Sequence, residues 1–258
     1  NAKESGTDEI NGLENLDDSQ QQTFVDQVTD STTTAAVEQI VADAKAAAEL
    51  AGQKVDAQAD VDDMTYLSDD EKVDYKQQIS DTTNATDVNA VVDEATDTNL
   101  ANAKESATTE IGNLANLSEA DQSTYTDQAN QATDVATVEQ AVTDAKNANQ
   151  AALAEAQKDA GATIDDMTYL STDEKDDAKQ QVAEATTIAD VEKVVSEVTD
   201  QNLANAKDWA NGEIADMTNL DADVKQSFDD QVSLAESTSA VEQIVADALH
   251  DAAVFQIE

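Results

Sequence analysis

Carboxylates are the most abundant groups in this chain that could do chemistry. The chain has 57 Asp and Glu residues, and two acidic stretches stand out. The first holds Asp60, Asp62, Asp63, Asp69 and Asp70, and the second holds Asp165, Asp166, Asp173 and Glu174. Both lack the spacing and the central glycine of an EF-hand loop. Helix caps and solvated helix faces explain acids at such positions. We therefore expect diffuse counterion binding and no cofactor, with specific calcium sites as the alternative.

Catalytic groups other than carboxylates are scarce. His250 is the single histidine and there is no cysteine. A nucleophile or a zinc site needs several such groups together. The chain has no glycine-rich phosphate loop, nucleophile elbow or H-E-x-x-H pattern. Paired carboxylates would need a cleft, which three thin helices do not provide. We predict that the chain is not an enzyme and that His250 is a surface residue.

The net charge of -44 excludes several classes of partner. All 13 basic residues are lysines, whereas nucleic-acid binding needs a basic surface in which arginine is favoured. An anionic membrane would also repel the chain, and no apolar run is long enough to span a bilayer. We expect no nucleic acid, no membrane and a monomer, because like charge favours solubility and an extended chain.

Trp209 is the one residue that breaks its own pattern. The equivalent positions are all polar: Ser5, Asp56, Ser106 and Asp159. A single tryptophan on a polar face could anchor a protein partner. We favour the other interpretation, in which Trp209 packs over a neighbouring junction or loop, and keep Trp209 as the candidate partner-binding residue.

These residues are set in a pattern that occurs five times, at intervals of about fifty residues. A leucine precedes a helix-capping residue at Leu16, Leu67, Leu117, Leu170 and Leu220, and a valine cluster begins about twenty residues later at Val37, Val88, Val138, Val191 and Val241. The pattern predicts five repeats, at 1–49, 50–99, 100–150, 151–202 and 203–258. The chain begins in mid-pattern, so we expect it to be a segment of a longer protein.

Each repeat reads as three helices. Apolar residues at helical spacing define the first helix, clearest at Leu100, Ala103, Ala107, Ile111, Leu114 and Leu117. The second helix starts at Asp17, Ser68, Ser118, Ser171 or Asp221, and the third at Thr33, Asn84, Asp134, Thr187 or Ser237. All ten are favoured N-cap residues. In the second helix, an aromatic residue four positions before an aliphatic one, as in Tyr75 and Ile79, is expected to contribute to the core. The fourth repeat has Ala178 in place of the aromatic residue, so we expect its core to be the thinnest.

The chain has no proline, so nothing stops the third helix from running into the next repeat. This continuity is clearest for 138–160 and for 37–59, while 97–99 and 199–202 could cap a fresh helix and kink the chain. The expected fold is all-α: a tandem array of five three-helix bundles joined by long shared helices into an elongated rod. The repeats also alternate. The first, third and fifth carry N-A-K, and the second and fourth carry D-D-M-T-Y-L.

Three segments carry a resemblance to a known family: L-A-N-A-K-E-S-A-T-T-E-I at 100–111, N-L-S-E-A-D-Q-S-T-Y at 116–125 and A-T-D-V-A-T-V-E-Q-A-V at 132–142. On these segments the chain resembles the GA-module superfamily of Gram-positive cell-wall proteins, which includes albumin-binding and extracellular-matrix-binding modules. The resemblance extends over essentially the whole chain. It implies left-handed three-helix bundles in an extracellular protein at the bacterial surface, anchored to the wall through parts outside this segment.

Two functions remain open from the sequence. The favoured one is a non-catalytic stalk that holds an adhesive domain away from the wall. The alternative is a module that binds a host serum or matrix protein such as albumin. The second helix of the first repeat exposes Gln20, Gln21, Gln22, Asp26 and Gln27, a solvated face that favours the stalk.

Overall fold

The chain is all-α over residues 1–254, the part that our computed structural model describes, with eleven helices and no strand in that range. The predicted fifth repeat therefore extends four residues beyond the described part. The helices are α1 (Ala2–Asn11), α2 (Asp18–Asp30), α3 (Thr34–Asp63), α4 (Asp69–Asp81), α5 (Ala85–Gly112), α6 (Glu119–Gln131), α7 (Val135–Asp165), α8 (Thr172–Glu184), α9 (Ile188–Asp216), α10 (Ala222–Leu234) and α11 (Thr238–Val254).

Four long helices each belong to two repeats. α3, α5, α7 and α9 have 30, 28, 31 and 29 residues, and every predicted repeat boundary falls inside one of them. The prediction of fresh helix caps at 97–99 and 199–202 is wrong, because α5 and α9 continue through both segments. Without proline or glycine there, each residue can extend the helix, and Asn99 and Asn202 use their side chains elsewhere.

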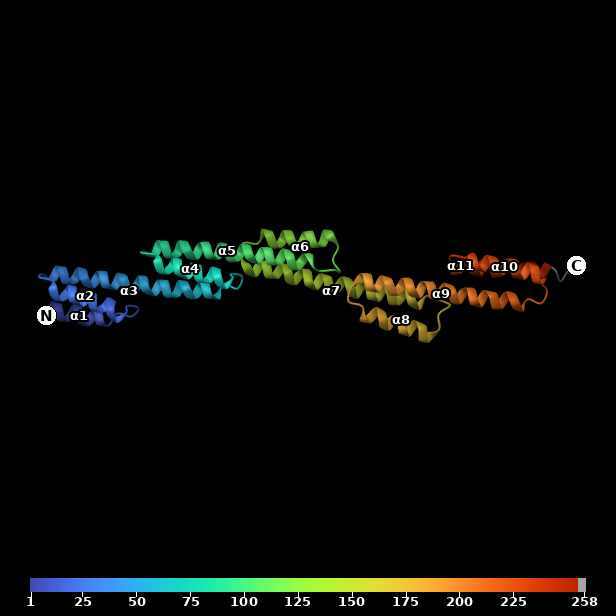
Figure 1. The fold of residues 1–258 in the computed structure, drawn as a ribbon, viewed down its shortest axis with the longest axis horizontal. Helices are drawn as coiled ribbons and strands as arrows, with labels where there is room; N and C mark the ends of the chain where they lie inside the picture. Colours follow the sequence, from blue (N-terminus) through green and yellow to red (C-terminus); the bar gives the residue numbers. More distant parts are fainter. Residues whose placement is uncertain (255–258) are drawn as a thin grey trace. The chain divides into compact units, whose positions relative to one another are not determined.

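The chain forms two compact units, residues 1–110 with 125–142, and 111–124 with 143–258. In the first unit, α1, α2 and the start of α3 pack against one another, and α4 packs against α3 (Figure 1). In the second unit, α8, α10 and α11 each pack against α9. The second, third and fourth bundles thus each contain two helices shared with a neighbour, whereas the first shares only α3 and the fifth only α9.

The bundle cores are narrow and built alike. One residue of the first helix is fully buried in all five repeats: Ile10, Val61, Ile111, Ile164 and Ile214. The second helix adds an aromatic ring in the second and fifth repeats, where Tyr75 and Phe228 are each 8% exposed. The cluster of the fourth repeat contains Ala178 and no aromatic residue, as the sequence predicted.

Nine of the ten predicted caps hold the helix starts through their side chains. Ser68 and Ser171 form full capping boxes with Glu71 and Glu174. Asn84, Asp134 and Ser237 accept from backbone N–H groups three residues ahead. Only Asp221 caps its helix without a side-chain bond. Each such bond satisfies a backbone donor that the helix itself leaves unpaired.

Candidate functional site at the repeat junctions

Buried asparagines hold the loop of one repeat against the helix that leads to the next. Asn99 and Asn202 lie in the shared helices α5 and α9, and each is 8% exposed. The backbone N–H of Tyr66 donates to Asn99 Oδ1 at 2.8 Å, and that of Tyr169 donates to Asn202 Oδ1 at 2.9 Å. A buried amide without a partner would be costly, so these bonds fix the loop between the first and second helices.

A second asparagine lies one turn further along each of these shared helices. Asn102 Nδ2 donates to the Tyr66 carbonyl oxygen at 3.1 Å and reaches the Glu71 carboxylate at 3.3 Å. The same bonds link Asn205 to Tyr169 and Glu174. The N-A-K asparagine therefore ties the capping box of one repeat to the first helix of the next.

These contacts shift the pKa of the capping carboxylates. Hydrogen bonds from the Ser68 side chain and backbone, and then from Asn102, hold the pKa of Glu71 below its ordinary value. The Ser171 side chain and backbone and Asn205 do the same for Glu174. The lowered pKa means that the charged form of each carboxylate is favoured by the folded junction.

The loop tyrosines reach across to the third helix of the following repeat. Tyr66 Oη donates to Glu139 Oε1 at 3.1 Å, and Tyr169 Oη donates to Glu242 Oε1 at 2.9 Å. Burial and then the neighbouring glutamate raise the pKa of both phenols, that of Tyr169 to about 12. The phenols therefore stay protonated at neutral pH and can keep donating.

Trp209 lies at the same junction as Tyr169. Their ring centroids are 5.4 Å apart with the planes tilted by 42°, a geometry typical of favourable aromatic pairs. The Trp209 side chain remains 39% exposed. Its role as a partner-binding residue stays a prediction.

The junction between the third and fourth repeats uses different chemistry. Asn116, 7% exposed, accepts from the Ile188 N–H at 2.8 Å and donates to the Thr186 carbonyl oxygen at 3.3 Å. Its own N–H donates to Asn149 Oδ1 at 2.9 Å. At this junction the side-chain amide of Asn116 binds backbone groups, whereas at the other two junctions a tyrosine hydroxyl binds a glutamate carboxylate. This difference matches the alternation of the two repeat types.

Sequence reasoning missed these junction residues, although a signal was present. A loop residue and its asparagine partner are 33 positions apart at all three of these junctions. The sequence pattern noted N-A-K and D-D-M-T-Y-L only as labels of the two repeat types. The recurrence of these two motifs was the available signal, but it did not identify Asn102 and Tyr66, or Asn205 and Tyr169, as partners in space.

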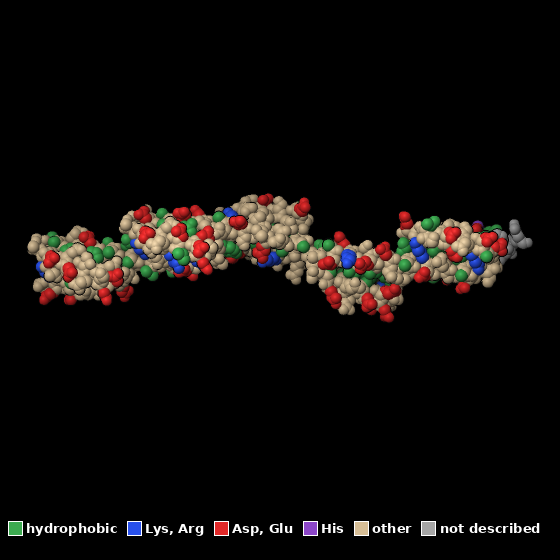
Figure 2. All heavy atoms as spheres, in the orientation of Figure 1, with side chains coloured by type: hydrophobic (Ala, Val, Ile, Leu, Met, Phe, Trp, Pro, Cys, Tyr) green, Lys and Arg blue, Asp and Glu red, His purple; other side chains and the backbone are tan. Residues whose placement is uncertain are grey.

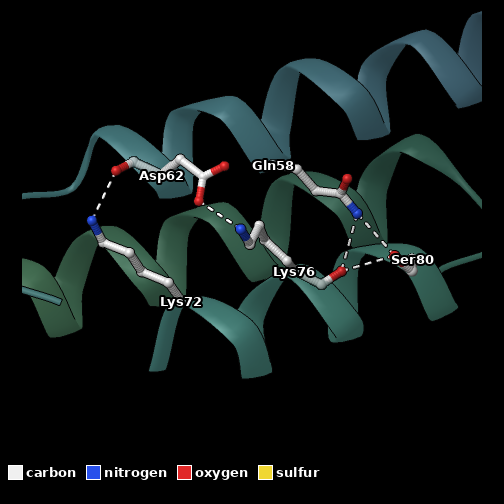
Figure 3. Close-up of polar contacts among 5 residues, drawn as sticks. All are labelled: Gln58, Asp62, Lys72, Lys76 and Ser80. Atoms are coloured by element: carbon white, nitrogen blue, oxygen red, sulfur yellow. Dashed lines mark hydrogen bonds and ion pairs between the residues drawn. The ribbon is translucent and has the colours of Figure 1, made fainter. Parts of the chain in front are cut away.

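In each acidic stretch considered for calcium, one aspartate is bound by two lysines. Asp62 at the end of α3 accepts from Lys76 Nζ at 2.6 Å through its carboxylate and from Lys72 Nζ at 2.8 Å through its carbonyl (Figure 3). Asp165 is held in the same way by Lys179 and Lys175. Within residues 1–254 no group of three or more Asp, Glu or His side chains is arranged to hold a metal ion.

Other lysines close the second helices in the same manner. Lys54 donates to the carbonyl oxygens of Ser80 and Thr82 at the end of α4, while Lys3 and Lys207 donate to those of Thr29 and Ser233. A cation is favoured at a helix C-terminus, where carbonyls are unpaired and the helix dipole is negative. On the face drawn in Figure 2, Asp and Glu side chains are more numerous than Lys side chains.

His250 lies in α11 with its side chain 78% exposed, and its Nδ1 is 3.7 Å from Asp251 Oδ1. Such an exposed position offers no enclosed site for chemistry.

No helix in the described part of the chain is long and apolar enough to cross a membrane.

Comparisons with known proteins agree with the repeat pattern. The GA module family matches residues 1–49, 47–101, 97–151, 150–202 and 200–250. A search of curated proteins found no match. Among solved structures, EbhA (756-1003 domain) from Staphylococcus aureus is 23% identical, with 76% of this chain and 98% of that chain covered and a TM-score of 0.25. Neighbouring family matches overlap inside the shared helices α3, α5, α7 and α9.

Proposed function

Because the chain belongs to the GA-module family, we propose that it is a non-catalytic repeat segment of a Gram-positive surface protein and that it acts as a stalk. In this role it holds an adhesive domain away from the cell wall. The segment would lie outside the cell, anchored through other parts of the protein.

The observation that supports a stalk most strongly is the continuity of helix across every junction. A bend at any junction within the described chain must distort one of the long helices α3, α5, α7 and α9. Where a loop is bonded to the next repeat, as Tyr169 is to Glu242, a bend must also break that contact. A chain of this kind resists bending through backbone hydrogen bonds rather than through a large core.

Charge adds to this stiffness. A net charge of -44 makes the repeats repel one another, which opposes collapse and self-association. The repulsion is screened beyond about 8 Å at physiological salt, so it acts mainly between neighbouring surfaces.

A host-protein-binding module is the second candidate. Val73 in α4 and Leu234 in α10 are 65% and 79% exposed, and Trp209 adds a partly exposed ring. Apolar side chains on second helices could contact a serum or matrix protein. Val73 and Leu234 lie in different repeats, however, whereas binding surfaces usually have a contiguous apolar centre.

A reach experiment tests the stalk. The chain is attached to beads through its C-terminus and carries a tag at its N-terminus. The tag is captured by antibodies on a surface that is covered by a polymer brush, and the height of the brush is increased in steps. Deleting residues 102–204 joins Ala101 to Asn205 and keeps the L-A-N-A-K junction intact. The full chain should be captured through brushes that exclude the deletion variant. Equal capture at every height would contradict the stalk.

A binding assay with the same two proteins tests the alternative. We expect no binding of albumin at concentrations on the order of tens of micromolar. A sub-micromolar complex with albumin or a matrix protein, weakened by Trp209→Ser or Leu234→Ser, would favour the binding module instead.

A further inference from the structure

The first repeat has an open groove between α1 and α3. The groove has a volume of about 380 Å³, and the residues that matter for the argument are Ala2, Ser5, Gly6, Val37, Glu38 and Val41. Its floor is apolar, since Val37 and Val41 are buried in the core, and Glu38 at its edge is exposed.

The equivalent residues of the fifth repeat already hold a tyrosine. They are Ala206, Trp209, Ala210, Val241, Glu242 and Val245. The ring of Tyr169, from the preceding repeat, packs against this cluster, and its hydroxyl donates to Glu242. Glu242 and Glu38 are the same residue of the V-E-Q motif.

The third repeat repeats the arrangement. Tyr66 Oη donates to Glu139, the V-E-Q glutamate of that repeat. Under the docked loops the alanines are fully buried, with Ala103 and Ala206 both 0% exposed. Their counterpart Ala2 is exposed. The groove of the first repeat is thus lined by residues equivalent to those that contact a tyrosine in the third and fifth repeats.

A second position distinguishes the two kinds of junction. Asn102 and Asn205, which bond the carbonyl of the docked tyrosine, correspond to Asn1. The fourth repeat is contacted by Asn116 rather than by a tyrosine, and its residue equivalent to Asn102 is Glu155. The equivalent residue of the second repeat is Gly52. The first repeat therefore has both features of a tyrosine acceptor, Asn1 and Glu38.

We propose that this groove is a docking surface for the first loop of a D-D-M-T-Y-L repeat joined to α1 through a shared helix. The tyrosine ring covers Val37 and Val41, its hydroxyl donates to Glu38, and Asn1 bonds its carbonyl. The two repeat types thus form a pairing rule: a tyrosine loop is followed by an N-A-K and V-E-Q repeat. This rule holds whether the array serves as a stalk or binds a partner.

The test places a tyrosine repeat directly before the intact chain. Residues 102–204 are fused ahead of Asn1, which reproduces the L-A-N-A-K junction found at 203–207. Amide hydrogen exchange is read on peptides that contain Ala35 and span 34–42, because residues 36–42 alone are identical to residues 240–246. The 34–42 sequence occurs once in the extended protein and is not covalently adjacent to the added segment. We expect exchange there to slow at least about threefold relative to the unextended chain, because docking covers this face.

Variants of the extended protein separate docking from mere attachment. Tyr169→Ala in the added segment should return exchange at 34–42 to the unextended rate, and Glu38→Gln, at an exposed position, should return it in part. Tyr169→Ala in the original segment is the matched control and should leave 34–42 unchanged. Exchange that is no slower in the extended chain, or slower regardless of the added tyrosine, would overturn the proposal. Slowing in the unextended chain as its concentration rises would identify a second copy as the occupant, and would also overturn it.

Discussion

Replacing Tyr75 with alanine should unfold the second repeat and leave distant repeats folded. Tyr75 is 8% exposed and lies in a cluster with Val61, Ile79 and Val88. Its hydroxyl forms a 2.7 Å hydrogen bond with Thr98 Oγ1 in the shared helix α5. The substitution therefore removes both the largest side chain of a narrow core and a bond to the junction helix.

The size of the effect follows from these contacts. Removing a buried aromatic ring costs about 3–5 kcal/mol, and the hydroxyl bond contributes about 1 kcal/mol more. A bundle of fifty residues is expected to have a free energy of unfolding of roughly 2.5–7.5 kcal/mol. Tyr75→Ala therefore removes most or all of the stability of this repeat. Tyr75→Phe keeps the ring and should cost only about 1 kcal/mol.

Native-state hydrogen exchange resolves the effect by repeat. In Tyr75→Ala, amides of α4 and of the adjoining halves of α3 and α5 should lose protection, while α10 and α11 keep theirs, since coupling in arrays acts mainly between neighbours. Val73→Ala, at a 65% exposed position of the same helix, is the control and should change little. Uniform loss of protection in all repeats, or no loss in any, would refute the modular account.

Four further predictions follow from the junctions and the charge. Asn202→Ala should destabilise the last two repeats by about 1–3 kcal/mol in urea titrations, because the buried Tyr169 N–H loses its acceptor. Because the pKa of the Tyr169 phenol is raised to about 12, its contribution to stability is fully present below about pH 10 and is lost as the pH rises toward about 12. Tyr169→Phe should therefore make the free energy of unfolding depend less on pH in that range. Melting temperature should rise from low to moderate NaCl and toward pH 5 as repulsion falls. The melting temperature should fall again in acid. The pKa of Glu174 is lowered in the fold, so its contribution to stability is fully present above the ordinary pKa of 4.5 and is lost as the pH drops through the folded value. A melting temperature that changes with neither salt nor pH would contradict these expectations. Trp209→Ser should cost about 0.5–1.5 kcal/mol in the last two repeats, because it removes the ring contact with Tyr169, whereas unchanged stability would favour a recognition role.

The helices and their starts could be predicted because their determinants are local. Thr33 and Thr187 cap α3 and α9 through groups three residues away, and the apolar spacing around Ile111 or Ile214 needs only helical geometry. Such signals remain visible in diverged repeats, because capping and helical spacing depend only on residues that are close in sequence.

The junction contacts could not be predicted in the same way. Asn99 has a residue type typical of a helix cap, and the sequence alone left that role open. In the fold it lies inside α5 and accepts from the Tyr66 N–H, a partner 33 positions away. Only the packing of one repeat on the next decides between these uses. The same holds for Asp62, which was considered as a calcium ligand and pairs with Lys76 across two helices.

Small-angle scattering on a length series tests the stalk most directly. The series has the chain without residues 102–204, the full chain, and the chain with 102–204 duplicated, which differ by two repeats at each step and keep every junction type. With helices such as the 30-residue α3 spanning roughly 45 Å each, the full chain should exceed roughly 100 Å, and the maximum dimension should grow by equal increments. A radius of gyration near the roughly 18 Å of a compact domain of this length, with a maximum dimension that grows only as the cube root of chain length, would contradict the stalk.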